Sequence, residues 1–246
     1  MEPKFALIIG GSGGIGLETA KNLSGQGIKV GITYHKNESK LKQELSKEHF
    51  ENYFLYPLNL TDEESIKETI FKILQEHEKI DIVIHCATTP VINRTVFDLD
   101  WQEFQQHLEV QIKGLFVIIK SLSPLIQKNH KIKFISVLTE YCFGKPPPQL
   151  SHYVTAKYGL MGFMRSMASE LTANGCTFNM VSPGMVDTAL LDDLHPRLRE
   201  ITSFKNPLKR IAKPSDVAET ISFLVSEKAD YLNGVNIPIN GGNVLM

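Results

Sequence analysis

Phe5-Ala-Leu-Ile-Ile-Gly-Gly-Ser-Gly-Gly-Ile-Gly16 is the stretch from which the class of fold can be predicted. It begins with a short, continuous apolar run, which is typical of a strand buried on both faces of a sheet. Gly10, Gly14 and Gly16 follow, and a helical pattern runs from Gly14 to Leu23. Glycines between a strand and a helix let the backbone approach a pyrophosphate, and the helix N-terminus adds N–H donors. The stretch therefore predicts a dinucleotide-binding turn, with a flexible turn that binds nothing as the alternative.

The remainder of the chain alternates strand-like and helix-like segments. The capping pattern Thr61-Asp-Glu-Glu64 opens one helix, and Pro124 should bend or end another. Pro238 cannot donate to a sheet ladder, so the last strand is expected at an edge. Alternation through short turns predicts a parallel sheet covered on both faces, in a single domain over residues 1–246. The expected strands are 5–9, 28–33, 80–84, 134–138, 176–181 and 235–239, and the expected helices are 14–23, 61–76, 101–126, 152–171 and 215–225.

Composition excludes several classes of partner. The 246 residues carry a formal net charge of −1 and are 42% hydrophobic, which suits a large core and gives no sign of a nucleic-acid or membrane-surface partner. No apolar stretch approaches the ~20 residues of a membrane span, and no secretory leader is recognisable. Cys86, Cys142 and Cys176 are widely spaced, which indicates free thiols in a reducing cytoplasm and neither a disulfide framework nor a metal site.

The end of the second strand bears on the choice of dinucleotide. An acid there would hold the ribose 2′-OH of NAD(H), whereas a basic group accommodates the 2′-phosphate of NADP(H). The chain reads Thr33-Tyr34-His35-Lys36 at this point, with no acid at the strand end. This favours NADP(H) over NAD(H), with Lys36 and His35 as candidate phosphate partners. A lysine that is merely solvated is the alternative.

A tyrosine and a lysine stand four residues apart, at Tyr153 and Lys157. On a helix this spacing places both on one face, with Cβ atoms roughly 5–6 Å apart. An ammonium so close stabilises a phenolate, so we expect the pKa of Tyr153 to lie below its ordinary value.

The glycine turn, Tyr153-x-x-x-Lys157 and Pro183-Gly184 together resemble the short-chain dehydrogenase/reductase family in its compact single-domain form. The resemblance runs from Phe5 to Gly242 and is nearest to the 3-oxoacyl-acyl-carrier-protein reductases. It implies a Rossmann-type, doubly wound α/β sheet of about seven parallel strands. It also implies hydride transfer between a nicotinamide and a carbonyl or secondary alcohol, in a homotetramer or homodimer.

The resemblance assigns roles to residues. Tyr153 is the general acid/base, Lys157 is its partner, Thr139 stands in the place of the family's serine, and Gln111 stands in the place of its asparagine, which holds a water linked to the lysine. Asn59 and Leu60 lie in a segment similar to the one that contacts adenine. The implied cofactor-binding residues are Gly10, Ser12, Gly13, Gly14, Ile15, Gly16, Tyr34, His35, Lys36, Asn59, Leu60, Cys86, Ala87, Pro183, Gly184, Val186 and Thr188.

Several positions depart from the family pattern. Thr139 stands fourteen residues before Tyr153, whereas Glu140 stands at the ungapped spacing; Thr139 is preferred because it keeps a hydroxyl donor, and Ser136 is interpreted as structural. Gln111 has one methylene more than asparagine, so its water link to Lys157 is expected to be rearranged or lost. His85 is interpreted as a packed histidine, with a catalytic base as the alternative.

Residues 187–213 are expected to cover the substrate. Their apolar positions have roughly helical spacing, which fits either a lid over an acyl or ring substrate or a helix pair packed on the core. The favoured activity is an NADP(H)-dependent ketoreductase acting on a carbonyl or acyl thioester, possibly on an acyl carrier protein. The alternative is a catalytically weak, NADP(H)-binding member of the family that serves as a regulatory or hetero-oligomer subunit. The apolar positions are Leu190, Leu191, Leu194, Leu198, Ile201 and Phe204.

Overall fold

Parallel strands form one sheet in the order β3-β2-β1-β4-β5-β6-β7 in the computed structural model, which describes residues 3–36, 38–46, 53–191 and 196–245. Successive strands run outward from β1 in one direction and then, from β4, in the other. This is the doubly wound α/β topology that was predicted, and the reversal between β1 and β4 is where such sheets bind ligands. The strands are β1 (Phe5–Ile9), β2 (Lys29–Tyr34), β3 (Tyr53–Pro57), β4 (Ile82–His85), β5 (Lys133–Val137), β6 (Thr177–Pro183) and β7 (Asn236–Ile239).

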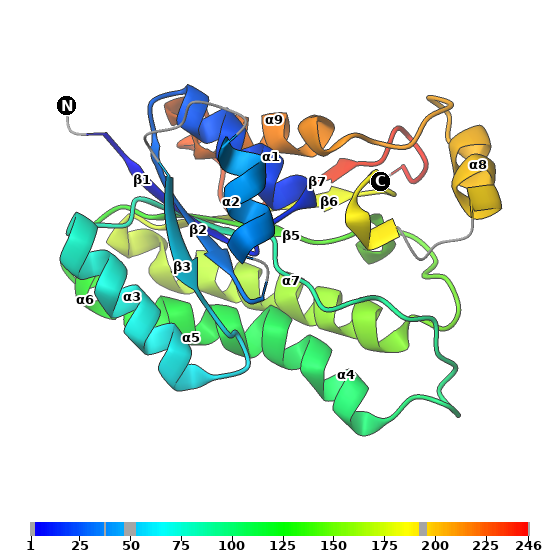
Figure 1. Ribbon diagram of the computed structural model, residues 1–246, viewed down its shortest axis with the longest axis horizontal. Helices are drawn as coiled ribbons and strands as arrows, with labels where there is room; N and C mark the ends of the chain where they lie inside the picture. Colours follow the sequence, from blue (N-terminus) through cyan, green and yellow to red (C-terminus); the bar gives the residue numbers. More distant parts are fainter. Residues whose placement is uncertain (1–2, 37, 47–52, 192–195, 246) are drawn as a thin grey trace.

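Helices cover both faces of the sheet (Figure 1). One face carries α1 (Gly14–Gly25), α2 (Glu38–Ser46) and α9 (Pro214–Val225). The other carries α3 (Glu63–His77), α4 (Trp101–Leu108), the π-helix η1 (Glu109–Lys113), α5 (Gly114–Ser121), α6 (Ser123–Ile126) and α7 (Ser151–Leu171). Figure 1 shows α8 (Pro196–Lys205) standing away from both layers.

Each face of the sheet has its own apolar core, because successive side chains of a strand point to opposite faces. In β1, Leu7 belongs to the core under α3, α5 and α7, whereas Ile8 belongs to the core under α1 and α9. Both side chains are fully buried. This explains why the strand reads as an unbroken apolar run in the sequence.

The start of α3 corrects one prediction. The N-cap is Asp62, whose carboxylate accepts hydrogen bonds from the backbone N–H groups of Glu64 at 3.0 Å and Ser65 at 3.4 Å. The expected cap at Thr61 is wrong, because the Thr61 hydroxyl donates instead to Asn59 Oδ1 at 2.9 Å. A neighbouring residue competed successfully for the same N–H groups.

The expected helix over residues 101–126 is also divided. It passes through the π-helix η1, ends at Ser121, and resumes as α6 with Pro124 in the first turn. The break therefore lies just before the proline, as expected from its missing N–H. Two elements, α2 and β3, were not predicted. Pro238 lies in β7 at the sheet edge, and this prediction is confirmed.

No described helix combines the length and the apolar character needed to cross a bilayer.

Replacing Asp62 by alanine should lower the free energy of unfolding by about 1 kcal/mol, because two N–H groups of α3 lose their acceptor. Urea denaturation measures this. Glu64→Ala is the matched control: its side chain is 71% exposed and pairs with Lys67 only at 3.8 Å, so it should cost less than about 0.5 kcal/mol. Equal losses in the two variants would contradict the assigned cap.

Candidate active site

The predicted site residues gather at the carboxyl edge of the sheet. Ala87 follows β4, Thr139 follows β5, and Pro183 ends β6. Because the strands are parallel, their carboxyl ends share one edge, next to the reversal between β1 and β4. Residues that are far apart in the sequence are thereby brought to one side of the molecule.

The glycine turn is shaped to hold a dinucleotide. A side chain on Gly10 would place its Cβ 2.5 Å from the Ala87 Cα, and one on Gly16 would place it 2.6 Å from the Gly10 carbonyl oxygen. At Gly13, by contrast, an added Cβ would meet nothing within 4 Å among the described residues. The turn is therefore closed on its inner side and open on its outer side.

Helix α1 starts at this opening and offers uncompensated donors. Within the described part of the chain, Gly13 gives no side-chain cap and the first turn carries no acid. Free N–H groups and the positive end of the helix dipole attract an anion such as a pyrophosphate. The residues present therefore fit a nicotinamide dinucleotide, with Ser12 and Ile15 in the same turn.

The segment after β6 returns to the glycine turn. Thr188 Cγ2 lies 3.0 Å from the position that a Gly14 Cβ would take, so Thr188 covers the turn. Gly184 is fixed by its N–H, which donates to the Ile239 carbonyl at 3.0 Å, and Val186 pairs with Ala212. These contacts build a wall facing the turn from β6.

Two bases directly follow β2, and an acid lies close by at the start of α2. His35 and Lys36 are exposed directly after the strand. The half-buried Tyr34 has a raised pKa, mainly through burial and a hydrogen bond to Glu38. Glu38 also pairs with Lys42 at 2.6 Å. Glu38 lies on the first turn of α2, a helix that the sequence pattern did not predict.

The residues expected to contact the adenine, Asn59 and Leu60, use their side chains for contacts within the protein. Asn59 Oδ1 accepts from the N–H and the hydroxyl of Thr61, at 3.2 and 2.9 Å. Leu60 packs into the core against Gly114. The backbone of this segment and the Asn59 Nδ2 group are left for a ligand.

Lys157 is a buried cation with defined acceptors. It is 3% exposed, and its Nζ donates to the Val137 carbonyl at 2.7 Å and to Gln111 Oε1 at 3.0 Å. Gln111 Nε2 in turn donates to the Ala87 carbonyl at 2.9 Å. Burial lowers the pKa of Lys157 to about 8. Gln111 lies in η1, and single π turns often occur at functional sites.

Tyr153 lies beside Lys157, with the ammonium 5.8 Å from the centre of its ring. Its pKa is nevertheless raised, because burial outweighs the hydrogen bond with Thr139 that lowers it. The expected lowering of the Tyr153 pKa is therefore wrong for this structure. Removing a phenolate from water destabilises it more than the neighbouring groups stabilise it. At neutral pH Tyr153 is a phenol, the form that can donate a proton.

Thr139 and Glu140 point in different directions. The Thr139 hydroxyl faces Tyr153, whereas the Glu140 carboxylate accepts a hydrogen bond from Asn243 Nδ2 at 3.0 Å. Ser136 is fully buried in β5, with its hydroxyl 3.2 Å from Met164 Sδ. Of the candidates for the hydroxyl role, only Thr139 is beside the tyrosine.

Buried histidines lie around Tyr153 and Lys157. The sequence pattern pointed to only one of them, His85. His85 packs against the backbone of η1, and its ring nitrogens make no well-formed hydrogen bond within the described residues. His107 lies 2.7 Å from the Thr89 hydroxyl, and its ring contacts those of His152 at 4.7 Å and Tyr153 at 6.2 Å between centroids. Burial lowers the pKa of His85 to about 3 and of His107 to about 4.

A family model described as Enoyl-(Acyl carrier protein) reductase matches residues 10–243 of the chain. The chain is a member of the short-chain dehydrogenase/reductase family. Short-chain dehydrogenases/reductases are oxidoreductases, and membership implies a nicotinamide cofactor, which the glycine turn fits.

Named short-chain dehydrogenase/reductase relatives match over nearly the full length. The 3-oxoacyl-acyl-carrier-protein reductase FabG of Staphylococcus epidermidis is 30% identical over 246 residues, covering 97% of this chain and 98% of that protein. FabG of Rickettsia conorii is 30% identical, covering 99% and 98%, and FabG of Thermotoga maritima is 28% identical, covering 100% and 99%. The crystal structure of gox2181 shares the fold, with a TM-score of 0.90, 20% identity and coverage of 99% and 96%.

The buried imidazoles should make the protein less stable in acid. Their native pKa values lie below the ordinary value of about 6.5. Between the native and the ordinary values, the unfolded chain therefore binds protons that the native chain does not bind. Stability is therefore complete above about pH 6.5 and falls as the pH falls toward the native values. At about pH 5, each such imidazole should cost about 2 kcal/mol.

Urea denaturation at about pH 7.5 and about pH 5 measures this loss. His107→Gln keeps an amide near Thr89 but cannot titrate, so it should remove roughly half of the loss that the two imidazoles cause. His35→Gln, at an exposed position, is the control and should leave the loss unchanged. A wild-type protein equally stable at both pH values would refute the effect.

Proposed function

We propose that the protein is an NADP(H)-dependent ketoreductase that reduces a 3-oxoacyl thioester or a similar carbonyl to a secondary alcohol. The observation that carries the proposal is the neutral Tyr153 phenol beside the Thr139 hydroxyl, next to the buried Lys157. Two O–H donors are thereby available for one carbonyl oxygen, beside a turn that fits a hydride donor. The named relatives support the same reaction.

A nicotinamide dinucleotide held at the glycine turn would supply the hydride for the carbonyl carbon. Thr139 donates a hydrogen bond to the carbonyl oxygen and polarises it, and Tyr153 transfers its phenolic proton to that oxygen as the C–O π bond opens. The phenolate left on Tyr153 is stabilised by the Lys157 ammonium, which is charged at neutral pH because its pKa is about 8. Gln111 holds that ammonium directly, where the family uses an asparagine and a water.

NADP(H) is proposed over NAD(H). The exposed bases His35 and Lys36 support a 2′-phosphate partner, and Glu38, an acid close to them in the chain, is already paired with Lys42. A carboxylate so engaged competes poorly for ribose hydroxyls, which supports the same choice.

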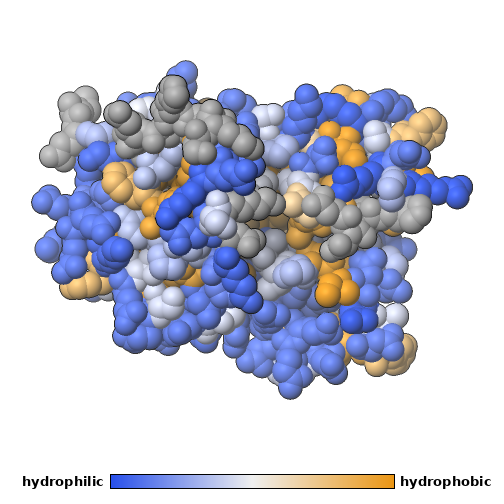
Figure 2. Space-filling view, viewed as in Figure 1, coloured by the Kyte–Doolittle hydropathy of each residue, from blue (hydrophilic) through white to orange (hydrophobic). Residues whose placement is uncertain are grey.

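The described part of residues 187–213 supports a substrate cover. No residue of α8 is buried, and Phe204 is 75% exposed, so α8 is not packed into the core. Of the two alternatives for this segment, we propose the lid. Leu194 lies outside the described residues. Figure 2 shows apolar patches on both halves of this face, including the half that holds α8.

We also propose a homotetramer or homodimer. Phe116 on α5 and Tyr158 on α7 are exposed, at 49% and 40%, and the Phe116 ring contacts Phe163 at 6.4 Å. Aromatic side chains exposed on adjacent helices support a contact with a second copy, and a monomer in analytical ultracentrifugation would contradict it.

Purified protein with NADPH should turn over 3-oxoacyl thioesters, followed by loss of nicotinamide absorbance. A trans-2-enoyl thioester belongs in the same panel, because the family model is described as an enoyl reductase. If only the enoyl substrate were turned over, the proposed reduction of a 3-oxoacyl thioester would be wrong and enoyl reduction would take its place. NADPH binding without any turnover would instead support the catalytically weak alternative.

Tyr153→Phe should lower kcat by about 10²–10⁴-fold, because the proton donor is lost, while the NADPH Kd stays within about twofold. Stopped-flow reduction and fluorescence titration separate the two quantities. Tyr231→Phe, at a fully exposed position with no role in the site, is the control and should behave as wild type. An unchanged rate in Tyr153→Phe would sink the assigned mechanism.

Lys36→Ala should raise the NADPH Kd by about tenfold, because a phosphate loses a cation, and should change the NADH Kd by less than about twofold. Isothermal titration with each cofactor measures this. Lys120→Ala removes an equal charge from an exposed site on α5 and should affect neither cofactor. Equal weakening of both cofactors by Lys36→Ala would refute the phosphate role.

A further inference from the structure

Glu140 is a buried carboxylate directly beside Thr139. It is 7% exposed, and within the described residues no lysine, arginine or histidine forms an ion pair with it. Its charge is met by amides: Asn243 Nδ2 donates to Oε2 at 3.0 Å, and the Asn240 side chain lies close enough to hydrogen-bond as well. A buried carboxylate without a cation is costly, and an apolar residue of similar size would often be as stable. The carboxylate therefore calls for a role other than stability.

Asn240 organises the C-terminal loop that Glu140 contacts. Its Oδ1 accepts from the Gly242 N–H at 3.1 Å, and its Nδ2 donates to the Val244 carbonyl at 3.0 Å. Asn240 is 7% exposed. The loop is therefore held from within, and Glu140 joins it to the start of the turn that carries Thr139.

The same loop supports the wall at Gly184. A Cβ added to Gly184 would lie 3.3 Å from Glu140 Oε1 and 3.4 Å from the Asn240 Cα. The Gly184 N–H donates to the Ile239 carbonyl, one residue before Asn240. Glu140 and the loop thus pack directly against the backbone of Gly184.

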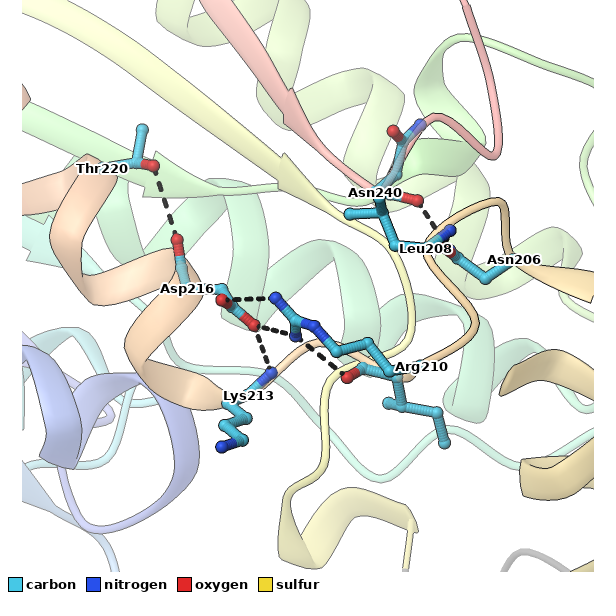
Figure 3. Close-up of polar contacts among 8 residues, drawn as sticks. Asn206, Leu208, Arg210, Lys213, Asp216, Thr220 and Asn240 are labelled. Atoms are coloured by element: carbon cyan, nitrogen blue, oxygen red, sulfur yellow. Dashed lines mark hydrogen bonds and ion pairs between the residues drawn. The ribbon is translucent and has the colours of Figure 1, made fainter. Parts of the chain in front are cut away.

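The loop also holds the segment that follows α8. Asn206 Nδ2 donates to the Asn240 carbonyl at 2.8 Å, and Asn206 Oδ1 accepts from the Leu208 N–H at 2.9 Å. Figure 3 shows this contact together with the second attachment, where Arg210 pairs with Asp216 of α9 at 2.6 and 2.9 Å. The chain after α8 is therefore fixed at two points, and one of them is the loop tied to Glu140.

We propose that Glu140 is a positioning residue. Through Asn243 and Asn240 it holds the wall at Gly184 and the segment after α8 in a fixed position relative to Thr139. The inference rests on the proposed function, in which the α8 segment covers the substrate, and on the expectation that Gly184 contacts the cofactor. A carboxylate suits the task because its two oxygens accept from two amides at once. Glutamine keeps one acceptor oxygen in the same place, whereas alanine keeps none.

The test compares Glu140→Ala, Glu140→Gln and Asn206→Ala. Glu140→Ala should raise the KM for the carbonyl substrate by about tenfold and speed amide hydrogen exchange in α8 and in residues 236–245 by about tenfold. Glu140→Gln keeps one of the two acceptor oxygens, so it should fall between wild type and Glu140→Ala in both. Asn206→Ala should raise the same KM severalfold and leave the NADPH Kd within about twofold, because Asn206 contacts the loop from the α8 side only.

Asn22→Ala is the matched control. Asn22 links α1 to α9 through hydrogen bonds to Glu219 at 2.9 Å and Ser222 at 2.7 Å, away from this loop. It should lower the melting temperature without changing the KM or the exchange of α8. Wild-type KM and exchange in Glu140→Ala would overturn the inference. If no substrate is turned over, the proposed function fails alone, and hydrogen exchange still tests the network.

Discussion

The buried ammonium of Lys157 is the constraint around which this site is arranged. An unpaired charge in the interior costs several kcal/mol, so its hydrogen-bond acceptors must be held in place. Those acceptors are the Val137 carbonyl at the end of β5 and the amide oxygen of Gln111 in η1. Gln111 reaches on to the Ala87 carbonyl, beside Gly10 of the cofactor turn. One cation thus ties α7, β5, η1 and the β4 loop to the turn.

Gln111 also explains how the chain departs from its family without losing this connection. The family's asparagine reaches the lysine through a water, whereas the longer side chain of glutamine touches the ammonium directly. Gln111 lies in the π turn and is fully buried.

Low polarity around this cation sets the protonation of the other groups. Burial keeps Tyr153 a phenol, His85 and His107 neutral, and the Cys86 thiol protonated. An ammonium beside a neutral phenol favours transfer of a proton to a carbonyl oxygen, because the phenolate that results lies next to that cation.

Short-range patterns in the sequence were enough to predict the glycine turn, most of the strands, the edge position of Pro238 and the helix that carries Tyr153 and Lys157, because backbone sterics and side-chain periodicity act over a few residues. They were insufficient where segments compete or meet: Asp62 displaced Thr61 as a cap, α2 brought Glu38 to Tyr34, and burial reversed the expected pKa shift of Tyr153. The direct contact of Gln111 with Lys157, and the turning of Glu140 toward Asn243, depend on elements more than forty residues apart. Desolvation and hydrogen-bond partners are properties of such packing, and the folded arrangement alone sets them.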